Sequence, residues 1–286
     1  MTPLSRYLAT FFTFLLVVVV DIYYGKHLFD PNSIYPFLIL MAIPASLCVF
    51  FGWEALVIVR KACIPIGIIV CTMNVVLFVN GSSNLSETIN QQRLFYSPLA
   101  LGIITSYVLS IIEKDKPIVM QHSRKIIFFI LLANSLVVWM AAKFMLLNNS
   151  DEGLSIFAFN DWRPICAFLV ILCLSSTHPR TATLPLFARL YKSSLLLVLL
   201  SVIYGISTYV SQSLDLSRLG PAVIDANSGI MTGSFLALVS ICLGGSQSQS
   251  TQESMFFDWH LIEAYAFYVL IIMPPLSIIE VVGINH

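Results

Sequence analysis

Long hydrophobic runs alternate with short polar connections along the whole chain. Several of these runs reach the roughly 18–20 residues that an α-helix needs to cross the hydrocarbon core of a bilayer. Nine runs are candidate membrane spans, near residues 6–24, 34–53, 57–80, 94–112, 126–147, 163–177, 193–211, 230–245 and 258–283. The pattern therefore predicts an all-α, polytopic transmembrane helical protein, and we expect residues 1–286 to form a single transmembrane domain.

The composition of the chain agrees with this pattern. Hydrophobic residues make up 58% of the 286 residues and charged residues only 10%, whereas soluble domains carry roughly 25% charged residues. The formal net charge is zero, which argues against a nucleic-acid partner. We therefore expect a multi-pass protein of the cell inner (plasma) membrane that is surrounded by lipid, with other membrane proteins as candidate partners.

The six cysteines indicate neither disulfides nor a metal site. All of them lie inside hydrophobic runs and no two form a Cys-x-x-Cys pair, so we interpret them as small buried hydrophobic residues. The chain also lacks a P-loop and the His-Glu-x-x-His and Gly-x-Ser-x-Gly motifs of hydrolases. From these patterns we predict no metal, no cofactor and no catalytic residue.

Lysine and arginine residues predict the orientation of the chain, because cytoplasmic connections of membrane proteins are enriched in them. With a cytoplasmic N-terminus, the cytoplasmic side holds ten of the fifteen: Arg6, Arg60, Lys61, Lys114, Lys116, Arg124, Lys125, Arg180, Arg189 and Lys192. The outer side then holds four connections rich in polar residues, 25–33, 81–93, 148–162 and 212–229. We therefore expect the N-terminus to lie in the cytoplasm.

Three arginines fall on the outer side, where positive charge is normally scarce: Arg93, Arg163 and Arg218. One interpretation is that each extends from a helix end into the lipid headgroups. The other is that they form an anion site, because a guanidinium binds phosphate oxygens bidentately. Both interpretations stand at this point, since sequence spacing does not show whether the side chains converge.

The interiors of the predicted spans are almost free of charged residues. Proton and ion pathways place Asp, Glu, His or Lys near the middle of spans, whereas Asp21, Lys143 and Glu263 lie towards the span ends. A proton- or sodium-coupled mechanism is therefore not expected, while passage of a neutral solute stays open.

The segment SRLGPAVIDANSGIMTGSFLALV, residues 217–239, joins an arginine, a Gly-Pro pair and an Asn-containing run of small residues directly to a span. This passage resembles one found in bacterial O-antigen ligases and the related Wzy-type O-antigen polymerases, with Arg218, Gly220 and Asn227 at its polar positions. Three preceding segments are also similar, so the resemblance covers roughly residues 125–245. They are KIIFFILLANSLVVWMAAKF, NDWRPICAFLVILCL and ARLYKSSLLLVLLSVIYGISTYV.

The resemblance implies an integral-membrane glycosyltransferase of lipopolysaccharide (O-antigen) biosynthesis. Such an enzyme uses an undecaprenyl-diphosphate-linked glycan at the periplasmic face. The resemblance further implies that Arg218 and Arg163 bind the diphosphate of this substrate, and that Gly220 and Asn227 form a supporting turn. Hydrogen bonds from guanidinium groups would stabilise the charge that develops on a leaving diphosphate.

The later part of the family pattern has no counterpart here. Family members carry a large periplasmic loop with a functional histidine, whereas this chain continues with one polar connection and one further span. His260 falls in a connection that the charge pattern assigns to the cytoplasm, so we carry no catalytic residue over, and catalytic and non-catalytic relatives both stay open. The alternative is a non-enzymatic multi-pass subunit, scaffold or lipid or solute transporter, for which we expect a flat apolar or small-residue helix face.

Overall fold

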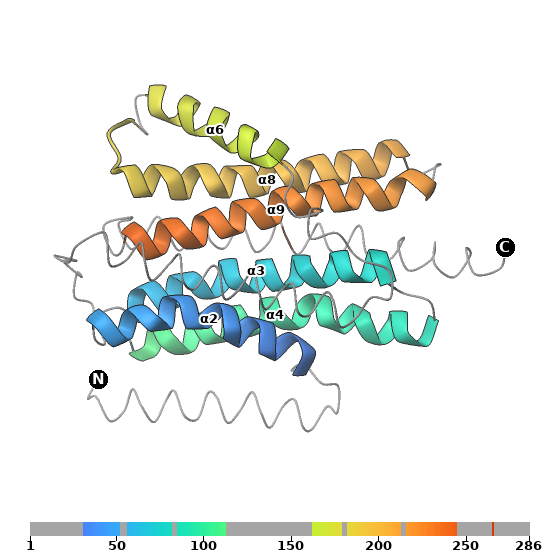
Figure 1. Ribbon diagram of the computed structural model, residues 1–286, viewed down its shortest axis with the longest axis horizontal. Helices are drawn as coiled ribbons and strands as arrows, with labels where there is room; N and C mark the ends of the chain where they lie inside the picture. Colours follow the sequence, from blue (N-terminus) through green and yellow to red (C-terminus); the bar gives the residue numbers. More distant parts are fainter. Residues whose placement is uncertain are drawn as a thin grey trace.

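The computed structural model describes residues 31–51, 56–81, 85–112, 162–178, 182–212, 216–244 and 265. The regular structure in this part of the chain is helical throughout, which confirms the all-α prediction for these residues. The helices are α2 (Pro31–Phe51), α3 (Leu56–Gly81), α4 (Leu85–Ile112), α6 (Trp162–Thr177), α8 (Leu186–Gln212) and α9 (Leu216–Gly244) (Figure 1).

Each of these helices overlaps one of the predicted spans. Among the described residues, three helices contain a stretch that is long and apolar enough to cross a membrane: Leu56–Val75, Leu186–Thr208 and Asp225–Leu243. The apolar parts of α2, α4 and α6 are shorter, at Ile34–Ser46, Ser97–Ser110 and Trp162–Thr177. The predicted spans 6–24 and 126–147, and 258–283 apart from Tyr265, lie outside the described residues.

The helices α4, α8 and α9 begin well before the predicted spans, at Leu85, Leu186 and Leu216. The polar connections predicted at 81–93 and 212–229 are therefore largely helical, and their prediction as loops was wrong. Hydropathy detects only the apolar part of a helix. The helix continues through polar residues, because its backbone hydrogen bonds do not require apolar side chains.

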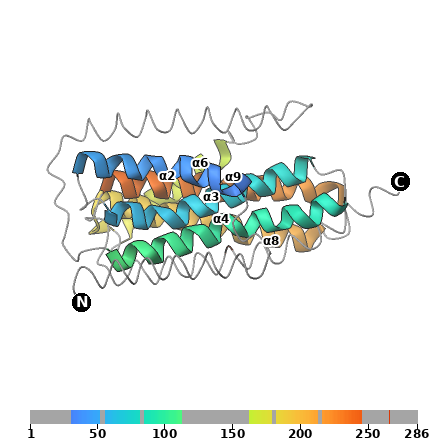
Figure 2. The same ribbon diagram turned by 90° about the horizontal axis from the view of Figure 1, so that it is seen from below.

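The described helices form a bundle in which most packed pairs are antiparallel, while α2–α4 and α6–α9 are parallel (Figure 1). The helices α3 and α8 run one way, and α2, α4, α6 and α9 run the other way (Figure 1). The helix α3 packs against α4 and α9, while α9 also packs against α8. The helix α2 lies against α3 and α4, and α6 lies at the edge of the bundle against α8 and α9 (Figures 1 and 2).

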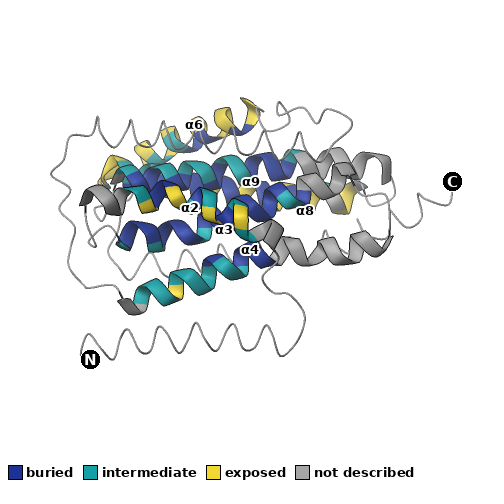
Figure 3. Ribbon diagram, turned by 60° about the horizontal axis from the view of Figure 1, so that its bottom comes forward, coloured by how far each residue is buried: buried dark blue, intermediate teal, exposed yellow. Residues whose placement is uncertain are grey.

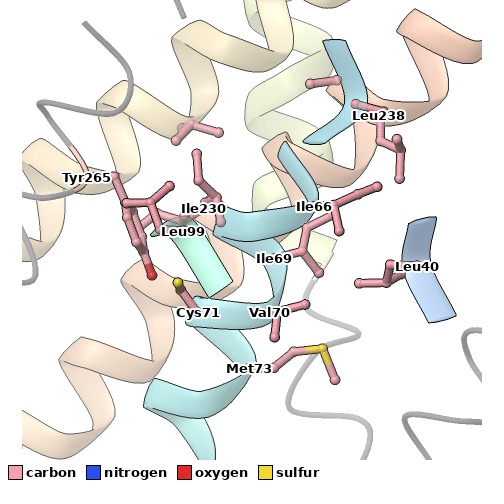
Figure 4. Close-up of a cluster of buried hydrophobic side chains, with 14 of the residues drawn as sticks. Leu40, Ile66, Ile69, Val70, Cys71, Met73, Leu99, Ile230, Leu238 and Tyr265 are labelled. Carbon is pink, nitrogen blue, oxygen red and sulfur yellow. The ribbon is translucent and has the colours of Figure 1, made fainter. Parts of the chain in front are cut away.

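The main hydrophobic core lies around α3. Its described side chains, from Leu56 to Val75, are all buried or half-buried (Figure 3). Ile66 and Ile69 of α3 belong to one cluster with Ile230 and Leu238 of α9, to which Tyr265 also contributes (Figure 4). The core therefore joins segments that are far apart in the sequence.

Glycines set the closest helix contacts. A Cβ added at Gly233 of α9 would lie 2.8 Å from the backbone oxygen of Ser194 in α8, and one added at Gly102 of α4 would lie 2.6 Å from that of Cys63 in α3. Close backbone approach at small residues is typical of helix pairs in membranes, where association relies on packing rather than on the hydrophobic effect. The two helix pairs α8–α9 and α3–α4 are thus built in the manner of membrane helices.

The directions of the helices determine at which end of the bundle the basic residues of their first turns lie. The helices α3 and α8 begin at the same end of the bundle (Figure 1), and their first two turns carry Arg60, Lys61, Arg189 and Lys192. We call this the basic end. The helix α9 begins at the other end, with Arg218 in its first turn. The helix α6 begins part-way along the bundle, with Arg163 in its first turn (Figure 1). The fold thus separates the two groups that the charge pattern assigned to opposite sides.

Candidate functional site

The segment Asp225–Gly229 (DANSG) lies in α9, at the level where α6 packs against it. The Asp225 side chain is 37% exposed, while Ala226, Asn227, Ser228 and Gly229 are all buried. Four consecutive residues cover most of the circumference of a helix. The helix is therefore enclosed by other parts of the chain at this level, and Asp225 marks its accessible side.

An ion pair joins α6 to α9 at this point. Nη2 of Arg163, the second residue of α6, donates a hydrogen bond to Oδ1 of Asp225 at 3.2 Å. The Arg163 side chain is 62% exposed. Of the two arginines predicted to bind a ligand, Arg163 is thus held by a carboxylate of the chain itself.

Arg218 lies in the first turn of α9, and its side chain is outside the described part of the structure. Position 218 precedes Asp225 by seven residues, which is almost two helical turns or about 10 Å along the axis. Positions seven apart lie on the same side of a helix. The backbone therefore places position 218 on the side of α9 that carries Asp225, and the predicted convergence of the Arg163 and Arg218 side chains stays a prediction.

The supporting turn predicted at Gly220 and Asn227 is absent, because both residues lie within α9. Gly and Asn indicate turns because they tolerate left-handed backbone conformations, but they also adopt helical ones. Asn227 is fully buried, with 0% exposure, rather than part of a polar surface loop. The turn that the resemblance implies is therefore replaced by continuous helix at both positions.

Buried polar atoms lie next to the ion pair along α9. Asn227 and Ser228 directly follow the Asp225 turn, and the Ser228 hydroxyl is buried without a hydrogen-bond partner among the described residues, as is that of Ser234. Other hydroxyls bond within their own helices, for example Ser201 Oγ to the Leu197 oxygen at 2.8 Å. The buried side of α9 therefore carries several polar side chains in addition to the apolar core residues.

The described residues contain no group of His, Cys, Asp and Glu that could hold a metal ion. Cys63, Cys71 and Cys242 are buried free thiols, as predicted, whereas Cys166 and Cys173 are exposed on α6. The prediction of burial was wrong for these two, because α6 lies at the edge of the bundle and turns much of its apolar surface outwards. The described part of the site therefore contains a guanidinium, the carboxylate that pairs with it, and buried hydroxyls.

Sequence reasoning missed Asp225. The residue stands in the quoted passage as the only acid between residues 216 and 244, and it falls on the predicted outer side, as Arg163 does. An acid and an arginine on the same side of a membrane protein are candidates for pairing, but 62 residues separate these two. Only the packing of α6 against α9 identifies them as partners.

Comparisons of the chain with protein-family models, with curated proteins and with solved structures found no match.

Proposed function

We propose that the chain is a multi-pass protein of the cell inner membrane that takes part in cell-surface polysaccharide assembly. In this proposal it has nine spans and a cytoplasmic N-terminus. It binds the diphosphate of an undecaprenyl-linked glycan at the periplasmic face, through Arg163 and Arg218. It acts as an O-antigen ligase or polymerase, or it is a non-catalytic relative that binds the same lipid-linked glycan.

The observation that carries the proposal is the position of the two arginines. Arg163 and Arg218 lie in the first turns of α6 and α9, two helices that pack against each other, away from the basic end. A diphosphate carries several negative charges and can accept bidentate hydrogen bonds from guanidinium groups. Two arginines on adjoining helices at the predicted outer face would supply that recognition.

The carboxylate of Asp225 fits this proposal as an internal substitute for the ligand. It occupies Arg163 with one oxygen at 3.2 Å, in the place where a phosphate oxygen would lie. A diphosphate has the higher charge and more oxygens, so it competes effectively for the same guanidinium. Without ligand, the positive charge of Arg163 is thus balanced by the carboxylate of Asp225 where α6 packs against α9.

Replacement of Arg218 in the native host tests the proposal. We expect Arg218→Ala to abolish or shorten long-chain glycan on the lipopolysaccharide ladder, and Arg218→Lys to restore it only in part, because an ammonium cannot bind bidentately. Lys192→Ala, a charge removal at the basic end, serves as the matched control and should leave the ladder unchanged. A normal ladder with Arg218→Ala, at a protein level equal to that of the wild type, would contradict the proposal.

A second candidate function is a non-enzymatic membrane subunit, scaffold or transporter. The specific observation in its favour is the Arg163–Asp225 ion pair, which by itself explains why an arginine lies at the start of α6. In that case the pair only ties two helices together, and no anionic ligand is needed. The two functions predict different effects for the two halves of the pair, as argued in the Discussion.

A further inference from the structure

The helix α6 is attached to the bundle by a narrow strip of side chains. Its buried residues are Pro164, Phe168 and Ile171, whose spacing places them on one stripe of the helix. Phe168 and Ile171 form a small cluster with Leu197 of α8, separate from the main core. Most other positions of α6 are exposed (Figure 3). Apolar packing therefore holds α6 much less firmly than it holds α3 or α9.

Polar contacts hold α6 at both of its ends, and the two ends differ. At the C-terminal end, Ser193 donates a hydrogen bond to Ser175 at 3.1 Å and Arg189 donates one to Ser176 at 3.4 Å. Both donors belong to α8, which follows α6 directly in the chain. At the N-terminal end the contact is the ion pair with Asp225 of α9. The C-terminal end is thus tied by chain connection and by two hydrogen bonds, while at the N-terminal end a charge pair links α6 to α9.

This ion pair has the features of a contact that a competing anion can break. Its 3.2 Å separation is longer than the roughly 2.7–2.9 Å of strong charge-assisted hydrogen bonds. Both side chains are partly exposed, and exposed ion pairs contribute little to stability. A phosphate group presents more negative charge to Arg163 than one carboxylate oxygen does, and it can reach the guanidinium from the exposed side.

We propose that the Arg163–Asp225 pair is a latch that holds the first turns of α6 against α9, and that a phosphate-bearing ligand opens it by drawing Arg163 away from Asp225. Once released, α6 swings about its Ser175–Ser176 end and uncovers the side of α9 that carries Asp225. The nature of the ligand rests on the proposed function. The latch itself rests on the ion pair and on the thin packing of α6.

Pulsed electron paramagnetic resonance on the full-length protein tests the latch without any added anion, in nanodiscs of phosphatidylcholine, whose headgroup has no net charge. Spin labels are placed on the native, exposed Cys166 of α6 and on Ser207→Cys of α8, with Cys48 and Cys173 replaced by Ser. We expect one narrow distance distribution, to which Asp225→Asn adds a population at longer distance. Asp225→Glu, which keeps the carboxylate, is the matched control and should retain the narrow distribution. An unchanged distribution in Asp225→Asn would overturn the latch.

The same labelled protein identifies the trigger. We expect inorganic pyrophosphate, and a polyprenyl diphosphate included in the nanodisc, to produce the longer distance in the wild type. Arg163→Gln should show this distance beforehand and respond to neither compound. A response to phosphatidylglycerol but to neither diphosphate would assign the trigger to lipid headgroups and refute the diphosphate ligand of the proposed function. If Asp225→Asn opens the latch and no phosphate compound does, the anionic trigger is overturned while the latch stands.

Discussion

Arg163 is predicted to bind an anionic ligand, and in the structure its guanidinium is paired with the carboxylate of Asp225. An exposed ion pair of this kind contributes about 0–1 kcal/mol to stability, because solvent screens the charges and two side chains lose conformational freedom. The pair therefore adds little to the total stability of the protein and can break at low cost. In the proposed function, this low cost lets the arginine change partner.

The two halves of the pair distinguish anion binding from a purely structural role. If the pair only ties α6 to α9, Arg163→Gln and Asp225→Asn remove the same interaction and should have equal effects on both thermal stability and the lipopolysaccharide ladder. If Arg163 binds a diphosphate, we expect loss of long-chain glycan in Arg163→Gln alone, because Asp225→Asn leaves the guanidinium available. The glycan ladder and the melting temperature in detergent are measured for both variants.

The double variant Arg163→Gln, Asp225→Asn provides the control for this comparison. It removes both charges, so its melting temperature should match those of the single variants, while its ladder should match that of Arg163→Gln. Equal ladders for the two single variants would contradict a role of Arg163 in binding the ligand and would favour the non-enzymatic function.

Sequence reasoning identified the arginine but not the acid. Arg163 is conspicuous because positive charge is scarce on the predicted outer side, which is a property of the whole sequence. Asp225 carries no such signal, and its partner lies 62 residues away. Contacts between distant segments depend on how the helices pack. The spacing of residues along the sequence does not show which helices become neighbours.

At the level of helices, α9 combines the candidate binding segment with a tight packing face. Gly229 and Gly233 lie about one turn apart, and both approach α8. At Gly229 the nearest atoms belong to the Ser201 side chain, whereas at Gly233 they include the backbone oxygen of Ser194. A side chain can be replaced or can rotate, but the backbone of a packed helix cannot retreat without moving the whole helix.

This difference predicts which glycine substitution can be rescued. We expect Gly229→Ala and Gly233→Ala each to lower stability by about 1–3 kcal/mol, as is typical of overpacking. Ser201→Gly should recover much of the loss in Gly229→Ala, because it removes the side chain that the new methyl group meets. Val198→Ala should recover little in Gly233→Ala, because the contact with the Ser194 oxygen persists. Chemical denaturation in detergent, read as two double-mutant cycles, measures both.

Full recovery of Gly233→Ala by Val198→Ala would contradict the close approach of the α8 and α9 backbones. The single variants Ser201→Gly and Val198→Ala supply the reference for each cycle, since a glycine in a helix has a cost of its own, about 1 kcal/mol. The cycle compares only the coupling between the two positions and therefore removes that cost.

At the scale of the whole molecule, the alternating directions of the helices put the basic residues of α3 and α8 at one end. Arg163 and Arg218 lie in the helices that begin towards the other end. From the enrichment of cytoplasmic connections in Lys and Arg, we propose that the basic end faces the cytoplasm. Two exposed positions flank α8: Ala182 precedes the helix and Ser211 lies near its end. The helix contains one of the stretches that are long and apolar enough to cross a membrane.

Labelling from the two sides of the membrane tests this assignment. In a variant with all six cysteines replaced, a membrane-impermeant maleimide should label Ser211→Cys in intact cells from outside. Ala182→Cys should be labelled only after the membrane is made permeable. The reverse pattern would invert the proposed orientation, and labelling of both from outside would contradict the crossing by α8. Labelling of both after permeabilisation confirms that each cysteine is reactive.

The all-helical class and the position of each described apolar segment followed from the sequence, because transfer of apolar side chains out of water is a local and additive property. The ends of α4, α8 and α9 did not follow, since polar residues continue a helix wherever hydrogen bonding and neighbouring helices support it. The exposure of Cys166 and Cys173 and the pairing of Arg163 with Asp225 also came from the three-dimensional arrangement. Both depend on where α6 lies against α8 and α9, and that position results from contacts between segments far apart in the chain.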